Sequence, residues 1–111
     1  YTFNLEASKE VPRRVSHPSR KTIGLRVPEH KALQELLALH GSALLATTLI
    51  AKDETEPMND AQEIRDRYEH QIAAVIDAGA CALEPTTVID LTGDAPEVIR
   101  QGGGDLATIG L

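Results

Sequence analysis

Apolar and polar residues alternate at the start of the chain, where every odd position of residues 1–7 is apolar and every even one is polar. A period of two is typical of a β-strand with one face turned to a core, so we expect a strand there. The same alternation over residues 22–27 predicts a second strand. Residues 86–91 and 97–100 are rich in Thr, Val and Ile, and the turn-forming residues between them predict a β-hairpin.

A helix is expected after the second strand, because apolar residues recur at helical spacing up to Leu39. Pro28 stands where a helix can begin, and Gly41 is the expected C-terminal cap. Residues 43–48 are then almost continuously apolar, which predicts a short buried strand.

A second helix is predicted to begin at Asp60, with Glu63 three residues later as in a capping box. It runs to about residue 70, and Glu63 and Arg67 have the spacing of an i,i+4 ion pair. Strands and helices thus interleave along the chain. This order predicts an α/β fold, with a mixed twisted sheet and flanking helices.

The composition indicates a globular domain and excludes several other classes of protein. The chain has 111 residues, 41% of them hydrophobic and 25% charged, which fits one globular domain. No apolar run is long enough to span a bilayer, so we expect no membrane partner. Aromatic residues make up only 3%, which argues against modules that stack bases on aromatic rings.

Charge is distributed unevenly. The net charge is −6, yet residues 1–31 hold seven basic and three acidic side chains, a local charge of +4. This asymmetry suggests that the N-terminal third meets an anionic partner, either a small phosphate compound or RNA. A solvated basic loop balanced by acidic helices explains the charge equally well. The candidate RNA contacts are Arg13, Arg14, Arg20 and Lys21.

Several familiar chemical motifs do not occur. The chain has no GxxxxGK[ST] phosphate loop, and Gly102–Gly104 opens no periodic helix, so we expect residues 102–111 to form a flexible tail. The four histidines are not at metal-ligand spacing. Cys81 lies between two alanines, which favours a buried structural thiol over a nucleophile.

What remains is a set of arginines and hydroxyls at predicted strand ends. Arg26 and Arg100 each close a strand, Thr48 ends one, and Thr86 and Thr87 begin one. Guanidinium and hydroxyl donors gathered in this way can hold an oxyanion. Each residue taken alone is also explained by a surface ion pair or by the β-propensity of Thr.

Five segments in this order resemble a known family. They are Lys21-Thr-Ile-Gly-Leu-Arg-Val-Pro-Glu-His30, Leu36-Leu37, Thr47-Thr48, Pro85-Thr-Thr-Val-Ile-Asp-Leu91 and Val98-Ile-Arg-Gln-Gly102. The chain resembles the YrdC/TsaC family of L-threonylcarbamoyladenylate synthases, and more closely its YciO branch. Members are about twice as long, so the resemblance implies the C-terminal part, residues 1–111, of one YrdC-like domain. The missing N-terminal half of the same protein would then be a partner.

The resemblance implies a cytoplasmic nucleotidyltransferase that converts ATP, L-threonine and bicarbonate to threonylcarbamoyl-AMP and pyrophosphate for tRNA modification. It implies that Arg26, Thr48, Thr86, Thr87 and Arg100 bind substrate or nucleotide, with Mg²⁺ expected beside ATP. It assigns no catalytic residue and no metal ligand to this chain, which we expect to be inactive alone.

One motif departs from the family. The family's Thr-Ser-Ala-Asn reads Thr47-Thr48-Leu49-Ile50 here, so Ile50 offers no amide to a nucleotide. Two alternatives therefore stay open beside the enzyme. One is a non-catalytic module that binds tRNA or double-stranded RNA, and the other is a regulatory or protein–protein domain with a vestigial cavity.

Overall fold

The strands and helices follow from the local sequence patterns. The computed structural model describes all residues from 1 to 111. The elements in chain order are β1 (Thr2–Glu6), a 3-10 helix (Arg13–Val15), β2 (Thr22–Leu25), α1 (Lys31–His40), α2 (Ala61–Tyr68), β3 (Val88–Asp90), β4 (Glu97–Arg100) and a 3-10 helix (Leu106–Ile109). The chain divides into two compact units, one of residues 1–45 with 84–111 and one of residues 46–83.

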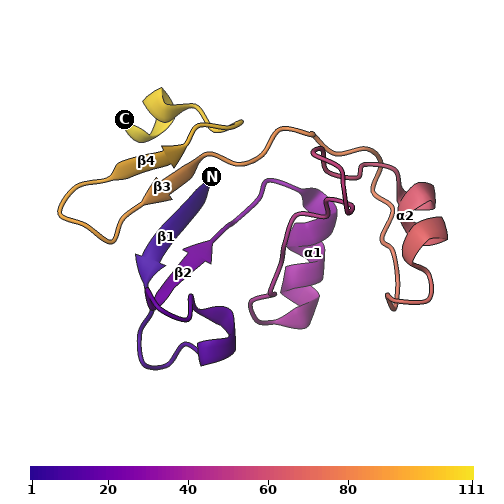
Figure 1. The fold of residues 1–111 in the computed structure, drawn as a ribbon, viewed down its shortest axis with the longest axis horizontal. Helices are drawn as coiled ribbons and strands as arrows, with labels where there is room; N and C mark the ends of the chain where they lie inside the picture. Colours follow the sequence, from indigo (N-terminus) through magenta and orange to yellow (C-terminus); the bar gives the residue numbers. More distant parts are fainter. The chain divides into compact units, whose positions relative to one another are not determined.

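The first unit contains a four-stranded sheet in the order β2-β1-β3-β4 (Figure 1). Strand β1 runs antiparallel to β2 and parallel to β3, and β4 returns antiparallel to β3 as the predicted hairpin. The sheet is therefore mixed, and with two helices in the chain the predicted α/β class is confirmed. A register shift between Val88 and Ile89 interrupts the β3–β4 ladder.

The core of the sheet is small. Its fully buried side chains are Ile89, 1% exposed, and Thr87, 0% exposed. Large apolar side chains elsewhere face solvent, among them Val27 at 82% and Leu39 at 88% exposure. Neither helix contains a buried residue.

Helix α1 begins three residues after Pro28. The Nδ1 atom of His30 accepts a hydrogen bond from the Leu33 backbone N–H at 3.3 Å and so caps the first turn. Gly41 ends the helix in the left-handed region with a φ of 77°, as the sequence predicted. Only glycine adopts this conformation without a steric penalty.

Helix α2 belongs to the second unit and begins where predicted. The Asp60 carboxylate accepts the backbone N–H groups of Gln62 at 2.9 Å and Glu63 at 3.1 Å. The predicted pair of Glu63 with Arg67 is wrong, because Arg67 pairs with Glu54 at 3.5 Å instead. Both partners are exposed, and such side chains choose among several acids at little energetic difference.

Two further predictions are wrong. Residues 43–48 form no strand, and Leu45 is 80% exposed where burial was expected. An apolar run has the composition of a buried strand, but a strand also needs a neighbour to pair with its backbone, which composition does not reveal. Cys81 is exposed rather than buried. Its apolar neighbours lie in an irregular segment with exposed side chains, which gives the thiol no core to enter.

The C-terminal residues after β4 fold back against the sheet. The Tyr1 hydroxyl donates to the Asp105 carbonyl at 2.7 Å, and the second 3-10 helix is capped by the Asp105 carboxylate. Flexibility of residues 102–111 stays a prediction about motion. Their structure is a bonded turn followed by a short helix.

Candidate functional site

Four of the predicted site residues lie at one end of the sheet. The pairing of Thr2 with Val88 and of Val88 with Arg100 places the start of β1, the start of β3 and the end of β4 together (Figure 1). Leu25 pairs with Phe3, so Arg26 follows β2 at the same end. Parallel β1–β3 pairing flanked by antiparallel strands thus gathers residues that are far apart in the sequence, such as Thr2 and Thr86, which are 84 positions apart.

Arg100 holds the segment that enters β3. Its Nε and Nη2 atoms both donate to the Thr86 carbonyl, at 3.0 and 2.9 Å, and Nη2 also lies 3.3 Å from Thr86 Oγ1. The Nη1 atom has no partner within the chain. Arg100 forms no ion pair, since the two in the structure involve Arg67 and His70. One edge of this exposed guanidinium is therefore available to an anion.

Thr2 joins this group, although the sequence analysis did not single it out. Its hydroxyl lies 2.8 Å from the Thr86 hydroxyl, and both side chains are half-buried. The only sequence signal was a polar residue in an alternating strand, and that signal does not distinguish Thr2 from Asn4. The strand pairing reveals the contact.

Thr87 occupies a different environment from its neighbour Thr86. Its hydroxyl donates to the Gly104 carbonyl at 2.7 Å and accepts the Gly102 N–H at 2.9 Å, and the residue is completely buried. The glycine segment also returns a bond from Gly103 N–H to the Pro85 carbonyl at 2.9 Å. Thr87 therefore closes the turn after β4 onto the start of β3 and has no surface open to solvent.

Arg26 is exposed and forms neither an ion pair nor a hydrogen bond in the structure. Gly24 lies two residues earlier, within β2. A Cβ at Gly24 would lie 3.3 Å from Asn4 Oδ1 and 3.5 Å from Thr2 Cγ2, so side chains of β1 flank this backbone. Arg26 is thus an exposed cation without an ion pair at this end of the sheet.

Thr48 lies in the second unit, with an exposed side chain and no hydrogen bond that fixes its hydroxyl. Ile50, the residue that departs from the family pattern, forms a β-bridge with Pro57, and the Met58 N–H bonds to the Leu49 carbonyl at 2.9 Å. These bonds turn residues 49–58 into a small loop of their own.

The candidate RNA contacts share one connection between β1 and β2. Arg13 and Arg14 lie in the first 3-10 helix, and Arg20 and Lys21 directly precede β2. All four side chains are exposed and none is in an ion pair. His17 shapes the loop, because its Nδ1 atom accepts the Arg20 N–H at 3.1 Å.

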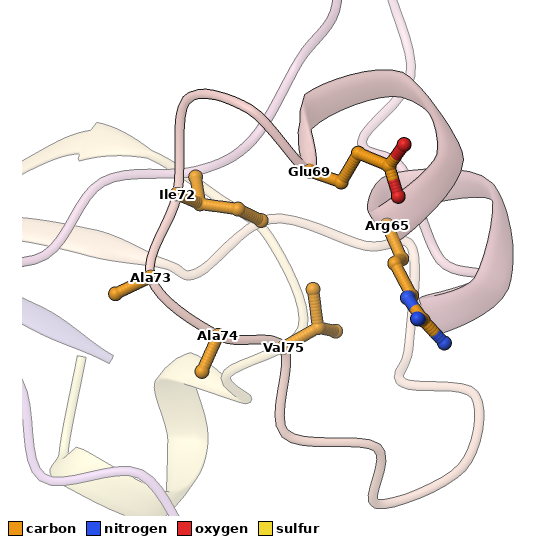
Figure 2. A pocket seen from close by; sticks show the side chains of 6 residues that line it. All are labelled: Arg65, Glu69, Ile72, Ala73, Ala74 and Val75. Carbon is orange, nitrogen blue, oxygen red and sulfur yellow. The ribbon is translucent and has the colours of Figure 1, made fainter.

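One open concavity of about 420 Å³ lies in the second unit beside α2 (Figure 2). Arg65 of α2 and Glu69, which follows the helix as its C-cap, form one wall, and residues 72–75 form the other. Figure 2 shows Ile72 and Val75 pointing into the space, while Ala73 and Ala74 point away. It contains none of the predicted site residues.

Asp90, at the end of β3, has a pKa below its ordinary value. The Thr92 hydroxyl and backbone N–H donate to its Oδ1 atom at 2.5 and 2.8 Å, and these bonds, with a weaker attraction from Arg20, hold the pKa below its ordinary value. Hydrogen bonds to the charged form favour ionisation. Asp90 therefore stays ionised and locally bonded.

The chain offers no metal centre and no membrane helix. No group of three or more His, Cys, Asp or Glu side chains is arranged to hold a metal ion. The donors around Thr86 are hydroxyl and guanidinium groups, which suit an anion and not Mg²⁺. Both helices are too short or too polar to cross a bilayer.

The sequence matches one family model over most of its length. The Sua5/YciO/YrdC model, described as "Telomere recombination", matches residues 1–102, and the chain belongs to this family. It is similar to the crystal structure of YciO of Escherichia coli, with a TM-score of 0.87 and 46% identity over 96% of this chain and 52% of that one.

Two further relatives extend the comparison. An uncharacterized protein of Haemophilus influenzae is 46% identical over 96% of this chain and 52% of its own length. A threonylcarbamoyl-AMP synthase of Schizosaccharomyces pombe is 29% identical over 81% of this chain and 22% of its own length. The chain thus spans about half the length of the YciO-type relatives that it matches.

Proposed function

We propose that this chain supplies part of a nucleotide site in a threonylcarbamoyl-AMP synthase-like protein, acting in the cytoplasm where ATP, L-threonine and tRNA meet. The observation that carries the proposal is the group of Arg26, Thr86 and Arg100 at one end of the sheet, with cationic N–H groups that no carboxylate neutralises. Family membership, with a threonylcarbamoyl-AMP synthase among the relatives, supports the same chemistry.

The proposed reaction joins ATP and the carbamate of L-threonine, which forms from bicarbonate. A carbamate oxygen bonds to the α-phosphorus, and the bond from that phosphorus to the bridging oxygen of pyrophosphate breaks. Pyrophosphate leaves with the electron pair of that bond. Such a transfer needs alignment and neutralisation of charge more than a protein nucleophile. Arginine and hydroxyl donors meet that need.

Each predicted residue has a place in this proposal. Arg26 and Arg100 neutralise phosphate charge and Thr86 donates a hydroxyl, whereas a role for Thr48 rests on the family resemblance alone. Thr87 does not contact the ligand in this proposal. Its buried hydroxyl holds the glycine segment in place through hydrogen bonds to Gly102 and Gly104. The remaining half of the family domain supplies the rest of the site, including ligands for any Mg²⁺ on the phosphates.

Ligand-dependent stability tests the proposal. Millimolar Mg-ATP should raise the melting temperature of the intact protein, followed by circular dichroism, because a ligand that binds only the folded state stabilises it. Arg26→Gln should reduce that shift, whereas Arg65→Gln, on α2 and outside the group, should keep it. Pyrophosphate release with L-threonine and bicarbonate tests the reaction. A melt that ATP leaves unchanged would contradict nucleotide binding.

RNA binding is a second candidate function, favoured by the four unpaired cations on the β1–β2 connection. Their contacts with phosphates would release counterions, so affinity for a tRNA or an RNA duplex should fall with salt at a log–log slope of about −3 to −4. Replacing both Arg13 and Arg14 by Gln should reduce the slope by about 2. An affinity that does not respond to salt would exclude this surface.

A further inference from the structure

The hydroxyls of Thr2 and Thr86 are hydrogen-bonded to each other, and together they carry two hydrogens, of which this bond uses one. They lie 2.8 Å apart, so one hydrogen is shared between them. Thr86 Oγ1 also faces Arg100 Nη2 at 3.3 Å, and Thr2 Oγ1 has no other partner. Each hydroxyl carries one hydrogen and accepts up to two bonds. One O–H of the pair therefore has no acceptor within the chain.

The contact with Arg100 determines which of the two hydroxyls donates more strongly to a bound anion. A hydroxyl that accepts a bond from a guanidinium is polarised and donates more strongly. This favours Thr86 as the donor to an anion, with Thr2 in turn donating to Thr86 Oγ1. In that arrangement both lone pairs of Thr86 are occupied, by Thr2 and Arg100, and its own hydrogen points away from both.

We propose that Thr2 is a positioning residue that acts through Thr86, fixing the Thr86 O–H as a donor to a phosphate oxygen of the ligand. The identity of that ligand as a nucleotide rests on the function proposed above. The free Nη1 edge of Arg100 lies on the same side chain that touches Thr86, so a phosphate oxygen would meet a hydroxyl and a cation together.

The adjacent Thr87 shows why only one of the two threonines serves this role. Its single hydrogen is donated to the Gly104 carbonyl, and the residue is fully buried. It has no hydrogen left for a ligand and no open surface. The half-buried Thr86 has both.

A double-mutant cycle on the intact protein tests the assignment, with dissociation constants for ATP and for inorganic pyrophosphate measured by calorimetry. Thr86→Val should weaken binding by roughly 10- to 100-fold, as expected for a lost bond to a charged group. Thr2→Val should weaken it by roughly 3- to 10-fold, because Thr86 keeps its hydrogen but loses its orientation. Thr2→Ser should restore wild-type binding.

The coupling distinguishes positioning from a structural role. In the Thr86→Val background, Thr2→Val should have almost no further effect, since it acts only through Thr86. Additive losses, or a Thr2→Val effect confined to the melting temperature, would overturn the proposal. Valine matches threonine in shape and β-branching, so a folded variant is expected. If Thr2→Val fails to fold, Thr2→Ala, which also removes the hydroxyl, provides the measurement.

The two ligands separate this inference from the proposed function. If pyrophosphate shows the coupling and ATP does not bind, the hydroxyl pair stands and the nucleotide function fails. If ATP binds and Thr86→Val leaves its affinity unchanged, the function stands and the pair is not part of the site. If the wild-type protein binds neither ligand, the proposal is wrong.

Discussion

Gly102 is the residue at which the turn after β4 closes onto the start of β3. A Cβ at this position would collide with the Pro85 carbonyl oxygen and would lie 2.7 Å from the Thr86 carbonyl carbon. Both are backbone atoms, so the turn itself would have to move. We expect Gly102→Ala to lower the free energy of unfolding by about 1–3 kcal/mol, measured by urea titration.

Gly103 provides the matched control one residue later. A Cβ there would meet the Glu84 carboxylate at 3.5 Å, an ordinary contact with the end of a flexible side chain. Gly103→Ala should therefore change the free energy of unfolding by less than about 0.5 kcal/mol. Equal losses for the two alanine variants would show that the close approach at Gly102 is not what stabilises the turn.

Asp90 gives a prediction for pH. Because its pKa is lowered in the fold, chiefly by the Thr92 hydroxyl, its ionised form stabilises the protein above the ordinary aspartate pKa of about 4. That contribution is lost as the pH falls through the lowered pKa. Thr92→Val should raise the pKa of Asp90, measured by NMR titration of its carboxyl carbon. Arg20→Gln should raise it less, and an unchanged pKa in Thr92→Val would contradict the assignment.

At the scale of elements, the N-terminal cap of α2 depends only on residues that are close in the sequence. The Asp60 carboxylate bonds two backbone N–H groups that would otherwise lack partners at the helix N-terminus. Asp60→Ala should destabilise the helix by about 1 kcal/mol, seen as faster amide hydrogen exchange in residues 61–68. Asp60→Asn keeps an oxygen acceptor and should exchange like the wild type. Identical rates in all three proteins would show that the cap contributes nothing.

The helices and strands that were predicted correctly are those specified by a pattern of neighbouring residues. Alternation located β1 and β2, helical spacing with Gly41 located α1, and Asp60 located the start of α2. The strand expected at residues 43–48 fails because pairing is a long-range property. The Thr2–Thr86 contact could not be predicted for the same reason, since it depends on the parallel pairing of β1 with β3.

At the scale of the whole molecule, motif order predicted the family and the α/β class, and both are confirmed. The candidate site was only partly accessible to sequence reasoning. The family resemblance assigned the same role to Thr86 and Thr87, but Thr87 is completely buried and Thr86 is not. The resemblance also selected Arg100, but it did not indicate that the Thr86 carbonyl already accepts hydrogen bonds from the Arg100 guanidinium. Roles of that kind depend on which hydrogen bonds are already made within the fold.

Exposed apolar side chains give the last prediction, which concerns the 111-residue chain as a molecule in solution. Leu39 and Leu45 are 88% and 80% exposed, and Val27 is 82% exposed, which is unusual for side chains of this size in a small domain. Burying them between copies would remove apolar area from water. We expect sedimentation velocity to show association of the isolated chain that increases with concentration, and the double substitution Leu39→Gln with Leu45→Gln to weaken it. Exchange of Lys52, an exposed residue of the second unit, for Gln should leave association unchanged. A chain that stays monomeric at every concentration would contradict the prediction.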